Sequence, residues 1–157
     1  MFETAGTPMR SDLIHQARAR ADLYHAIAEI FLSGIESDDL LERLTTANNI
    51  LNISSTQPLM AELERLAGES AEQKARLSMN TFGPTVGSLY PPYSTEYTNE
   101  MFRKEQELAD IAGFYHAWGV MLTDELHERC DHFGVEADFL AYLSVREAYA
   151  RLHPGQP

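Results

Sequence analysis

Apolar residues along the chain recur at steps of three and four positions, which is the spacing of one face of an α-helix. The longest such stripe begins soon after Ser11, a residue type that caps helix N-termini, and precedes Gly34. Its members are Ile14, Ala17, Ala21, Tyr24, Ile27, Ala28 and Phe31. We therefore predict an amphipathic first helix between Ser11 and Gly34 that buries this stripe.

The same spacing predicts five further helices, which we place at about 37–47, 56–68, 70–82, 99–118 and 131–152. Segment 48–55 is turn-rich, and Ser70 with Gln73 has the spacing of a capping box. The side chains expected to face inward from the last helix are Phe139, Tyr142, Leu143 and Tyr149. No stretch alternates with the period of a strand. We predict an all-α fold, a single helical bundle of about six helices in one domain that spans residues 1–157.

Residues 83–98 interrupt the helical pattern. They read GPTVGSLYPPYSTEYT, with three prolines, two glycines and three tyrosines. Non-periodic segments of this length in a compact domain are usually functional. Tyr93 and Tyr97 in this loop, and Trp118 beyond it, have two interpretations: they close the core, or they line an apolar groove for a peptide. For Trp118 the core is the favoured interpretation.

The charge balance is strongly acidic, with 24 acidic and 12 basic residues and a net charge of -12. Residues 96–138 hold eleven of the acids and three of the bases, so -8 of the net charge lies there. This balance argues against binding to nucleic acid or an anionic membrane, and favours a basic peptide as ligand. No apolar run is long enough for membrane insertion. A single cysteine and the lack of a secretory leader indicate a cytoplasmic protein.

Metal and nucleophile chemistry find little support in the sequence. His127 and His132 are five residues apart, whereas a helical zinc motif needs a spacing of four, and Cys130 alone cannot supply paired thiolates. No phosphate-binding loop and no serine-nucleophile motif is present, so we expect no metal and no other cofactor. The enzyme alternative is a small metal- or nucleotide-dependent hydrolase that uses Asp131, His132 and Glu136.

The pair Asp131-His132 also has two interpretations. Asp131 is a good N-cap for the last helix, where its charge suits the positive end of the helix dipole, and His132 then lies half-buried beside it. In the second interpretation the pair lies at the edge of a groove, where a carboxylate binds an arginine guanidinium through two parallel hydrogen bonds.

Two blocks of sequence resemble a known family. The first is Tyr90-Pro-Pro-Tyr93-Ser-Thr-Glu96-Tyr97, and the second is Glu128-x-x-Asp131-His132-x-x-x-Glu136-x-x-Phe139-Leu140. Together with Phe114-Tyr115-x-x-Trp118-Gly119 and the long first helix, they resemble the TorD/DmsD/NarJ family of redox-enzyme maturation proteins in order and spacing. The resemblance covers about residues 10–152. The Tyr-Pro-Pro-Tyr sequence is most similar to that of the family branch that serves dimethyl-sulfoxide-reductase-type enzymes.

This resemblance implies an all-helical cytoplasmic chaperone without catalytic activity. Its partner would be the catalytic subunit precursor of a molybdoenzyme, bound through its twin-arginine signal peptide or a segment of the apoprotein. Export would then wait until the molybdenum cofactor is inserted. The residues implied to bind the peptide are Asp131 and His132, with Tyr93, Glu96, Trp118 and Glu136 nearby.

The sequence departs from the family pattern in two places. Cys130 stands where the family usually has a proline before Asp-His, and the chain ends at Pro157, where relatives commonly continue into further helix. The second departure would leave one flank of the core uncovered. We therefore expect either a homodimer, formed by exchange of helices, or a chain that lacks a C-terminal helical portion.

Overall fold

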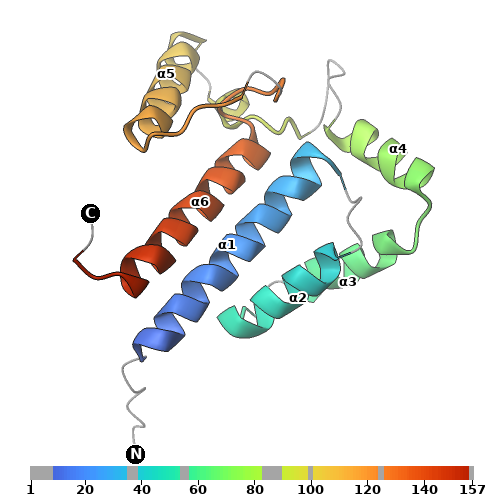
Figure 1. Cartoon of the computed structure of the whole chain (residues 1–157). Coiled ribbons are helices and arrows are strands. Elements are labelled where there is room, and N and C mark those ends of the chain that lie inside the picture. Colours follow the sequence, from blue (N-terminus) through green and yellow to red (C-terminus); the bar gives the residue numbers. More distant parts are fainter. Residues whose placement is uncertain are drawn as a thin grey trace, which may run out of the picture.

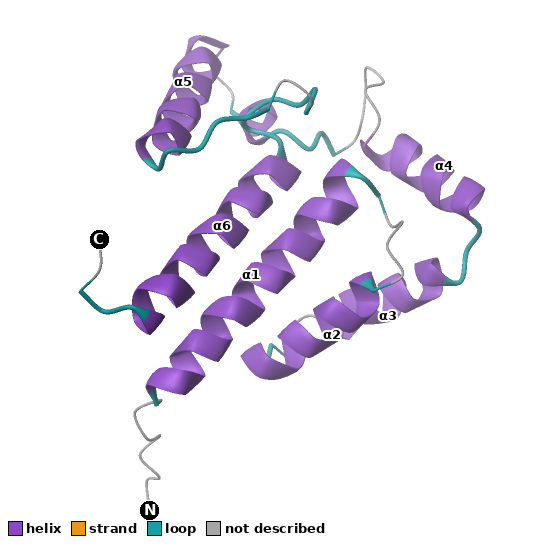
Figure 2. Ribbon diagram, viewed as in Figure 1, coloured by secondary structure: helices purple, strands orange, loops and turns teal. Residues whose placement is uncertain are grey.

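The computed structural model describes residues 9–34, 39–53, 57–82, 90–98, 101–123 and 126–155. Its helices are α1 (Arg10–Leu32), α2 (Leu40–Leu51), α3 (Gln57–Ala67), α4 (Ala71–Phe82), α5 (Met101–Ala117) and α6 (Phe133–Leu152), with a short 3-10 helix, η2 (Ser94–Tyr97), before α5. These ranges contain no strand, and the predicted all-α bundle is confirmed (Figure 2). Helix α1 lies at the centre, with α6 on one side and α2 and α3 on the other (Figure 1).

The most extensive helix pair is α1 with α6, which lie side by side and run antiparallel (Figure 1). Along its buried face α6 carries small side chains at steps of three and four residues. These are Gly134, Ala137, Ala141, Ser144 and Ala148. Small residues let two helix backbones approach closely, and a Cβ built on Gly134 would lie 2.8 Å from Cγ of Leu32. We call this interface the small-residue seam.

Ion pairs on both flanks of the seam show which face of α1 meets α6. Arg20 pairs with Glu147 at 2.5 Å, and His25 pairs with Asp138 at 3.0 Å. Around these two positions α1 carries buried alanines of its predicted stripe. They are Ala17, Ala21 and Ala28. The predicted stripe is therefore buried or half-buried along its whole length.

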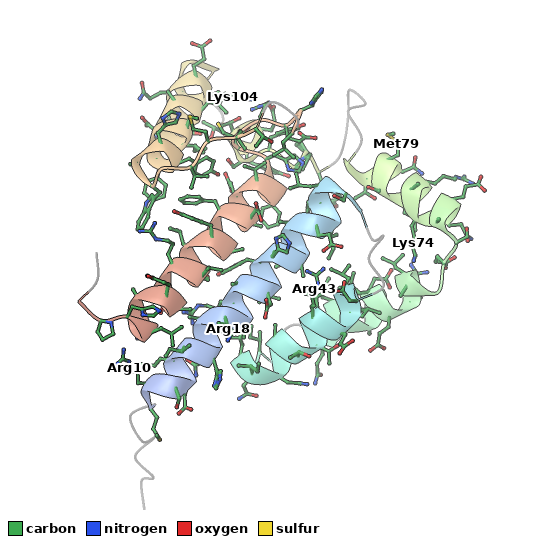
Figure 3. All side chains as sticks on the ribbon, viewed as in Figure 1. Arg10, Arg18, Arg43, Lys74, Met79 and Lys104 are labelled. Atoms are coloured by element: carbon green, nitrogen blue, oxygen red, sulfur yellow. The ribbon has the colours of Figure 1, made fainter. Side chains whose placement is uncertain are left out.

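Another face of α1 packs against α2 and α3. The buried core on this side consists of Ala26, Leu40, Leu44 and Leu63. Arg43 on α2, labelled in Figure 3, pairs its guanidinium with the carboxylate of Glu29 on α1, and both side chains are half-buried. At the far end of α1, Arg10 donates from Nε to the carbonyl of Arg151 at 2.7 Å. This bond fastens the start of α1 to the last turn of α6.

Two of the predicted end signals act as expected. Gly34 adopts φ +86°, and its N–H donates to the carbonyl of Glu29 at 3.1 Å, which closes the end of α1. Ser70 and Gln73 form the predicted capping box: the N–H of Ser70 donates to Oε1 of Gln73 at 3.1 Å, and the N–H of Gln73 donates to Oγ of Ser70 at 3.3 Å. Helix α4 follows and ends at Phe82, as predicted.

Three expectations about helix limits and burial are wrong. Helix α1 begins two residues earlier, at Arg10, with Met9 and not Ser11 as its N-cap. Helix α2 continues to Leu51 where a turn was expected, because the left-handed Asn52 at φ 52° closes it only there. Tyr149 is exposed, because the small residues and not the large ones form the seam of α6. The expected start of the second helix, at residue 37, lies outside the described residues.

None of the helices in the described ranges combines the length and the apolar character that a membrane crossing requires.

Candidate functional site

The loop before α5 is joined to the start of α6 by backbone hydrogen bonds. Tyr93 and His132 form an isolated antiparallel bridge. Two N–H groups donate to carbonyls across it, Ser94 to Asp131 at 2.9 Å and Phe133 to Pro92 at 2.7 Å. We call residues 90–98 and 128–136 together the loop–helix junction. The two blocks that resemble the family therefore meet in space.

Asp131 lies at the centre of this junction with 0% of its surface exposed. Its Oδ2 accepts a hydrogen bond from the backbone N–H of Thr95 at 3.2 Å and another from the Thr95 hydroxyl at 2.7 Å. Arg129 adds a two-point ion pair, with Nε donating to Oδ1 at 2.9 Å and Nη2 donating to Oδ2 at 2.8 Å. A buried carboxylate requires such partners because it has lost its water.

The guanidinium of Arg129 covers Asp131 on its outer side. Its central carbon lies 4.6 Å from the centre of the Tyr93 ring, a cation–π distance. Further donors reach Thr95 Oγ1 at 2.6 Å and Glu96 at 3.3 Å. Burial disfavours the charge, but Asp131 and Glu96 outweigh burial and raise the pKa of Arg129. The Arg129 side chain nevertheless remains 41% exposed.

His132, and not Asp131, is the N-cap of α6. Its Nδ1 accepts a hydrogen bond from the N–H of Gly134 at 3.1 Å, so this nitrogen carries no proton. Only 3% of His132 is exposed, and the Tyr93 ring packs edge-on against the imidazole at 5.2 Å. Burial lowers the pKa of His132, and the carboxylates of Glu128 and Asp131 offset part of this effect. The imidazole is therefore a neutral structural group.

Glu96 lies on the outer rim of the junction. It accepts hydrogen bonds from Arg129 and from Lys104 of α5, the latter at 2.9 Å, and these bonds lower the pKa of Glu96. Lys104 is labelled on α5 in Figure 3. Glu96 therefore joins α5 to the junction and keeps part of its surface open to solvent.

Two further carboxylates face this region. Glu128 accepts a hydrogen bond from the Tyr93 hydroxyl at 3.0 Å, and burial together with this bond raises the pKa of Tyr93. Glu136, in the first turn of α6, accepts a hydrogen bond from the Ser94 hydroxyl at 2.9 Å. Burial raises the pKa of Glu136, although the Ser94 bond offsets part of this. Both carboxylates are half-buried at the edge of the junction.

The end of α5 and the residues after it expose large apolar side chains. They are Phe114, Trp118, Met121 and Leu122. Beneath them, buried Tyr115 packs against Phe139 of α6 and donates from its hydroxyl to the carbonyl of Cys130 at 3.1 Å, which ties this helix to the junction. Trp118 is 40% exposed, so the interpretation that it closes the core is wrong. We call the four exposed side chains the α5 apolar surface.

The described residues contain no group of three histidine, cysteine or carboxylate side chains placed to hold a metal ion. The Cys130 thiol donates to the carbonyl of Leu108 at 3.5 Å, and burial and Asp131 both raise the pKa of this thiol, which makes it a poor nucleophile. Asp131, His132 and Glu136 are each bonded to groups of the chain itself. This geometry does not favour a hydrolase built on those three residues.

In a comparison with family models, residues 56–154 match the nitrate reductase delta subunit family. The matched region is more than half of the 157-residue chain and includes the whole loop–helix junction. The chain belongs to this family. Its members are chaperones for the maturation of molybdoenzymes, and the resemblance at the family level is thereby confirmed. No curated protein and no solved structure matches the chain.

Five of the six residues that the sequence singled out come together in the junction of this chaperone. They are Tyr93, Glu96, Asp131, His132 and Glu136. Trp118 lies apart, where its carbonyl accepts a hydrogen bond from the Tyr142 hydroxyl at 3.2 Å. Sequence reasoning missed Arg129 and Thr95, the two partners of Asp131. The signal for Arg129 was present, because an arginine two residues before a buried acid is the nearest available counter-charge.

Proposed function

We propose that this chaperone binds the twin-arginine signal peptide, or a segment of the apoprotein, of a molybdoenzyme catalytic subunit. It would do so in the cytoplasm, delaying export and assisting insertion of the molybdenum cofactor. Membership of a molybdoenzyme chaperone family supports the class of partner. The Tyr-Pro-Pro-Tyr sequence of the loop supports a dimethyl-sulfoxide-reductase-type enzyme as the specific partner.

The observation that carries the proposal is an acid-rich junction tied directly to an exposed apolar surface. A signal peptide of this type offers two guanidinium groups followed by an apolar stretch. Glu96, Glu128 and Glu136 provide carboxylates at the junction. The α5 apolar surface provides large side chains that are exposed to solvent. Exposed ion pairs contribute about 0–1 kcal/mol each, so apolar burial supplies most of the affinity, and the acids act on encounter rate and orientation.

Asp131 and His132 have a different proposed role from the rim acids. Both are buried and bonded within the chain, so they hold the loop against α6 and fix the positions of Tyr93 and Glu96. Direct contact of these two residues with the peptide stays a prediction. Such contact requires the bonds described above to open.

The test is a fluorescence titration, because Trp118 is the single tryptophan of the chain and lies on the α5 apolar surface. We expect a peptide with an arginine pair and an apolar stretch to shift the Trp118 emission to shorter wavelength. Raising the salt concentration should slow association more than it speeds dissociation. A scrambled peptide of the same composition is the control. Equal binding of both peptides, or an association rate that salt leaves unchanged, would contradict the proposal.

A homodimer is proposed separately. Helix α6 exposes Val145, Tyr149 and Leu152, which are apolar side chains that a second copy would cover. Sedimentation at several protein concentrations checks this. A single monomeric species at every concentration would exclude it.

A further inference from the structure

We infer that the chain's own Arg129 occupies the arginine site of the junction, and that an arginine of the bound peptide takes its place. This inference rests on the proposed function, since it names how that ligand is recognised. In the absence of peptide, Arg129 acts as an internal substitute that keeps the site closed.

The site has the shape that recognises a guanidinium. Asp131 presents both carboxylate oxygens to two nitrogens of Arg129 at 2.9 and 2.8 Å, in the parallel arrangement that lysine cannot reproduce. The Tyr93 ring supplies an aromatic face at 4.6 Å, and the Thr95 hydroxyl oxygen accepts a third bond. The carboxylate of Asp131, the aromatic ring of Tyr93 and the hydroxyl oxygen of Thr95 therefore all contact one planar guanidinium.

The burial of the two partners is unequal, and this favours exchange. Asp131 is fully buried, so it requires a cation at all times. Arg129 is 41% exposed and approaches from outside, in a non-helical segment before α6, so its side chain can leave without unpacking the helices. A peptide arginine that arrives from solvent would meet the same ligands. Glu96, which also pairs with Lys104, retains a positive neighbour when Arg129 moves.

The main test measures peptide binding to Arg129→Ala. Two peptides are used that differ only in carrying an arginine pair or a lysine pair before the apolar stretch. Because the variant lacks the Arg129 guanidinium that competes with the peptide, we expect it to bind the arginine peptide at least about tenfold more tightly than the wild-type chain does. The lysine peptide should gain much less. Arg103→Ala, which removes the same charge from an exposed position on α5, is the matched control and should change neither affinity.

A second measurement does not depend on any peptide. Arg129→Ala leaves Asp131 buried without its cation, so we expect the melting temperature to fall by roughly 6 °C or more. Methylguanidinium at tens of millimolar should restore part of this loss, whereas methylammonium at equal ionic strength should not. The wild-type chain should respond to neither. If Arg129→Ala does not fold, Arg129→Lys replaces it in both measurements, because lysine keeps the charge and loses the two-point pair.

The outcomes separate this inference from the proposed function. If wild type and variant bind the arginine peptide equally, Arg129 is only a structural partner of Asp131, and the inference fails while the proposed function stands. If methylguanidinium gives no restoration, the site does not take a free guanidinium and the inference also fails. If no form of the chain binds either peptide, the proposed function fails and the inference fails with it.

Discussion

Two regions hold helix α6 in place, the small-residue seam and the loop–helix junction, and their side chains differ in chemistry. Along most of its length α6 packs on α1 through alanine, serine and glycine. At its start it is held by the ion pair between buried Asp131 and partly exposed Arg129, by a histidine cap and by a two-bond backbone bridge. Both regions are closely packed and both fix the same helix. They differ in the kind of substitution that they tolerate: the seam is sensitive to added side-chain volume, and the junction is sensitive to the loss of a polar partner.

This difference follows from what each contact excludes. The small-residue seam excludes volume, because a methyl group added at Gly134 meets side-chain atoms of Leu32 and Phe31 on α1. The loop–helix junction excludes water, because Asp131 has exchanged its hydration for four hydrogen bonds from Thr95 and Arg129. A seam of this kind stabilises the fold, whereas a polar junction with an exposed partner leaves a place where a ligand can compete.

The largest expected effect is on the junction. Asp131→Ala removes the buried partner of Arg129 and leaves the Thr95 N–H without its acceptor, so we expect a loss of about 3 kcal/mol in the free energy of unfolding. Asp138→Ala, on the same helix but with an exposed carboxylate paired to His25, is the control and should cost at most about 1 kcal/mol. Urea unfolding measures both. Equal small losses would show that water replaces the buried bonds, and the distinction between the regions would disappear.

A smaller effect is expected in the seam, where Gly134 can be compared with a glycine outside it. A Cβ at Gly134 would lie 2.8 Å from Leu32 and 3.1 Å from Phe31, so Gly134→Ala should destabilise by about 1–3 kcal/mol despite the better helix propensity of alanine. Gly113, in the interior of α5, has nothing within 4 Å of such a Cβ. Gly113→Ala should therefore stabilise by up to about 1 kcal/mol. Thermal and urea unfolding would show opposite signs, and the same sign for both would contradict close packing of the seam.

The helices were predictable because their signals are local. The stripe of α1, the capping box of Ser70 and Gln73 and the left-handed glycine after α1 each act within a few residues. The seam was less predictable, because hydrophobic periodicity gives the greatest weight to large side chains. It selected Tyr149, which is exposed, and overlooked Ala137 and Ser144, whose value lies in being small.

The candidate site was predictable as a set of residues but not as an arrangement. Tyr93 and His132 are far apart in sequence, and no local rule indicates that they pair as neighbouring strands do. The role of Asp131 was also assigned differently. An acid before a helix usually caps it, but here the tertiary partners Thr95 and Arg129 bind Asp131, and His132 takes the cap. The tertiary partners of Asp131 therefore overrode the local preference that favoured it as the cap.

The smallest expected effect depends on pH and isolates the histidine cap. Burial holds the pKa of His132 below the ordinary 6.5, so below that pH the unfolded chain takes up a proton that the folded chain does not. Stability should therefore be lost as the pH falls below 6.5. His132→Asn keeps a good N-cap that does not titrate. Near pH 8 the two proteins should be similarly stable, whereas near pH 5 the wild type should lose on the order of 1 kcal/mol relative to the variant.

Comparing the two proteins also removes the contribution of Glu136, whose raised pKa acts in the opposite direction, since a folded state that binds protons more readily gains stability as the pH falls. The carboxylates that face His132, Glu128 and Asp131, are present in both proteins and oppose the effect of burial only in part. Urea unfolding at several pH values gives the difference directly. A difference that does not change with pH would mean that His132 titrates alike in both states. The neutral cap would then be excluded.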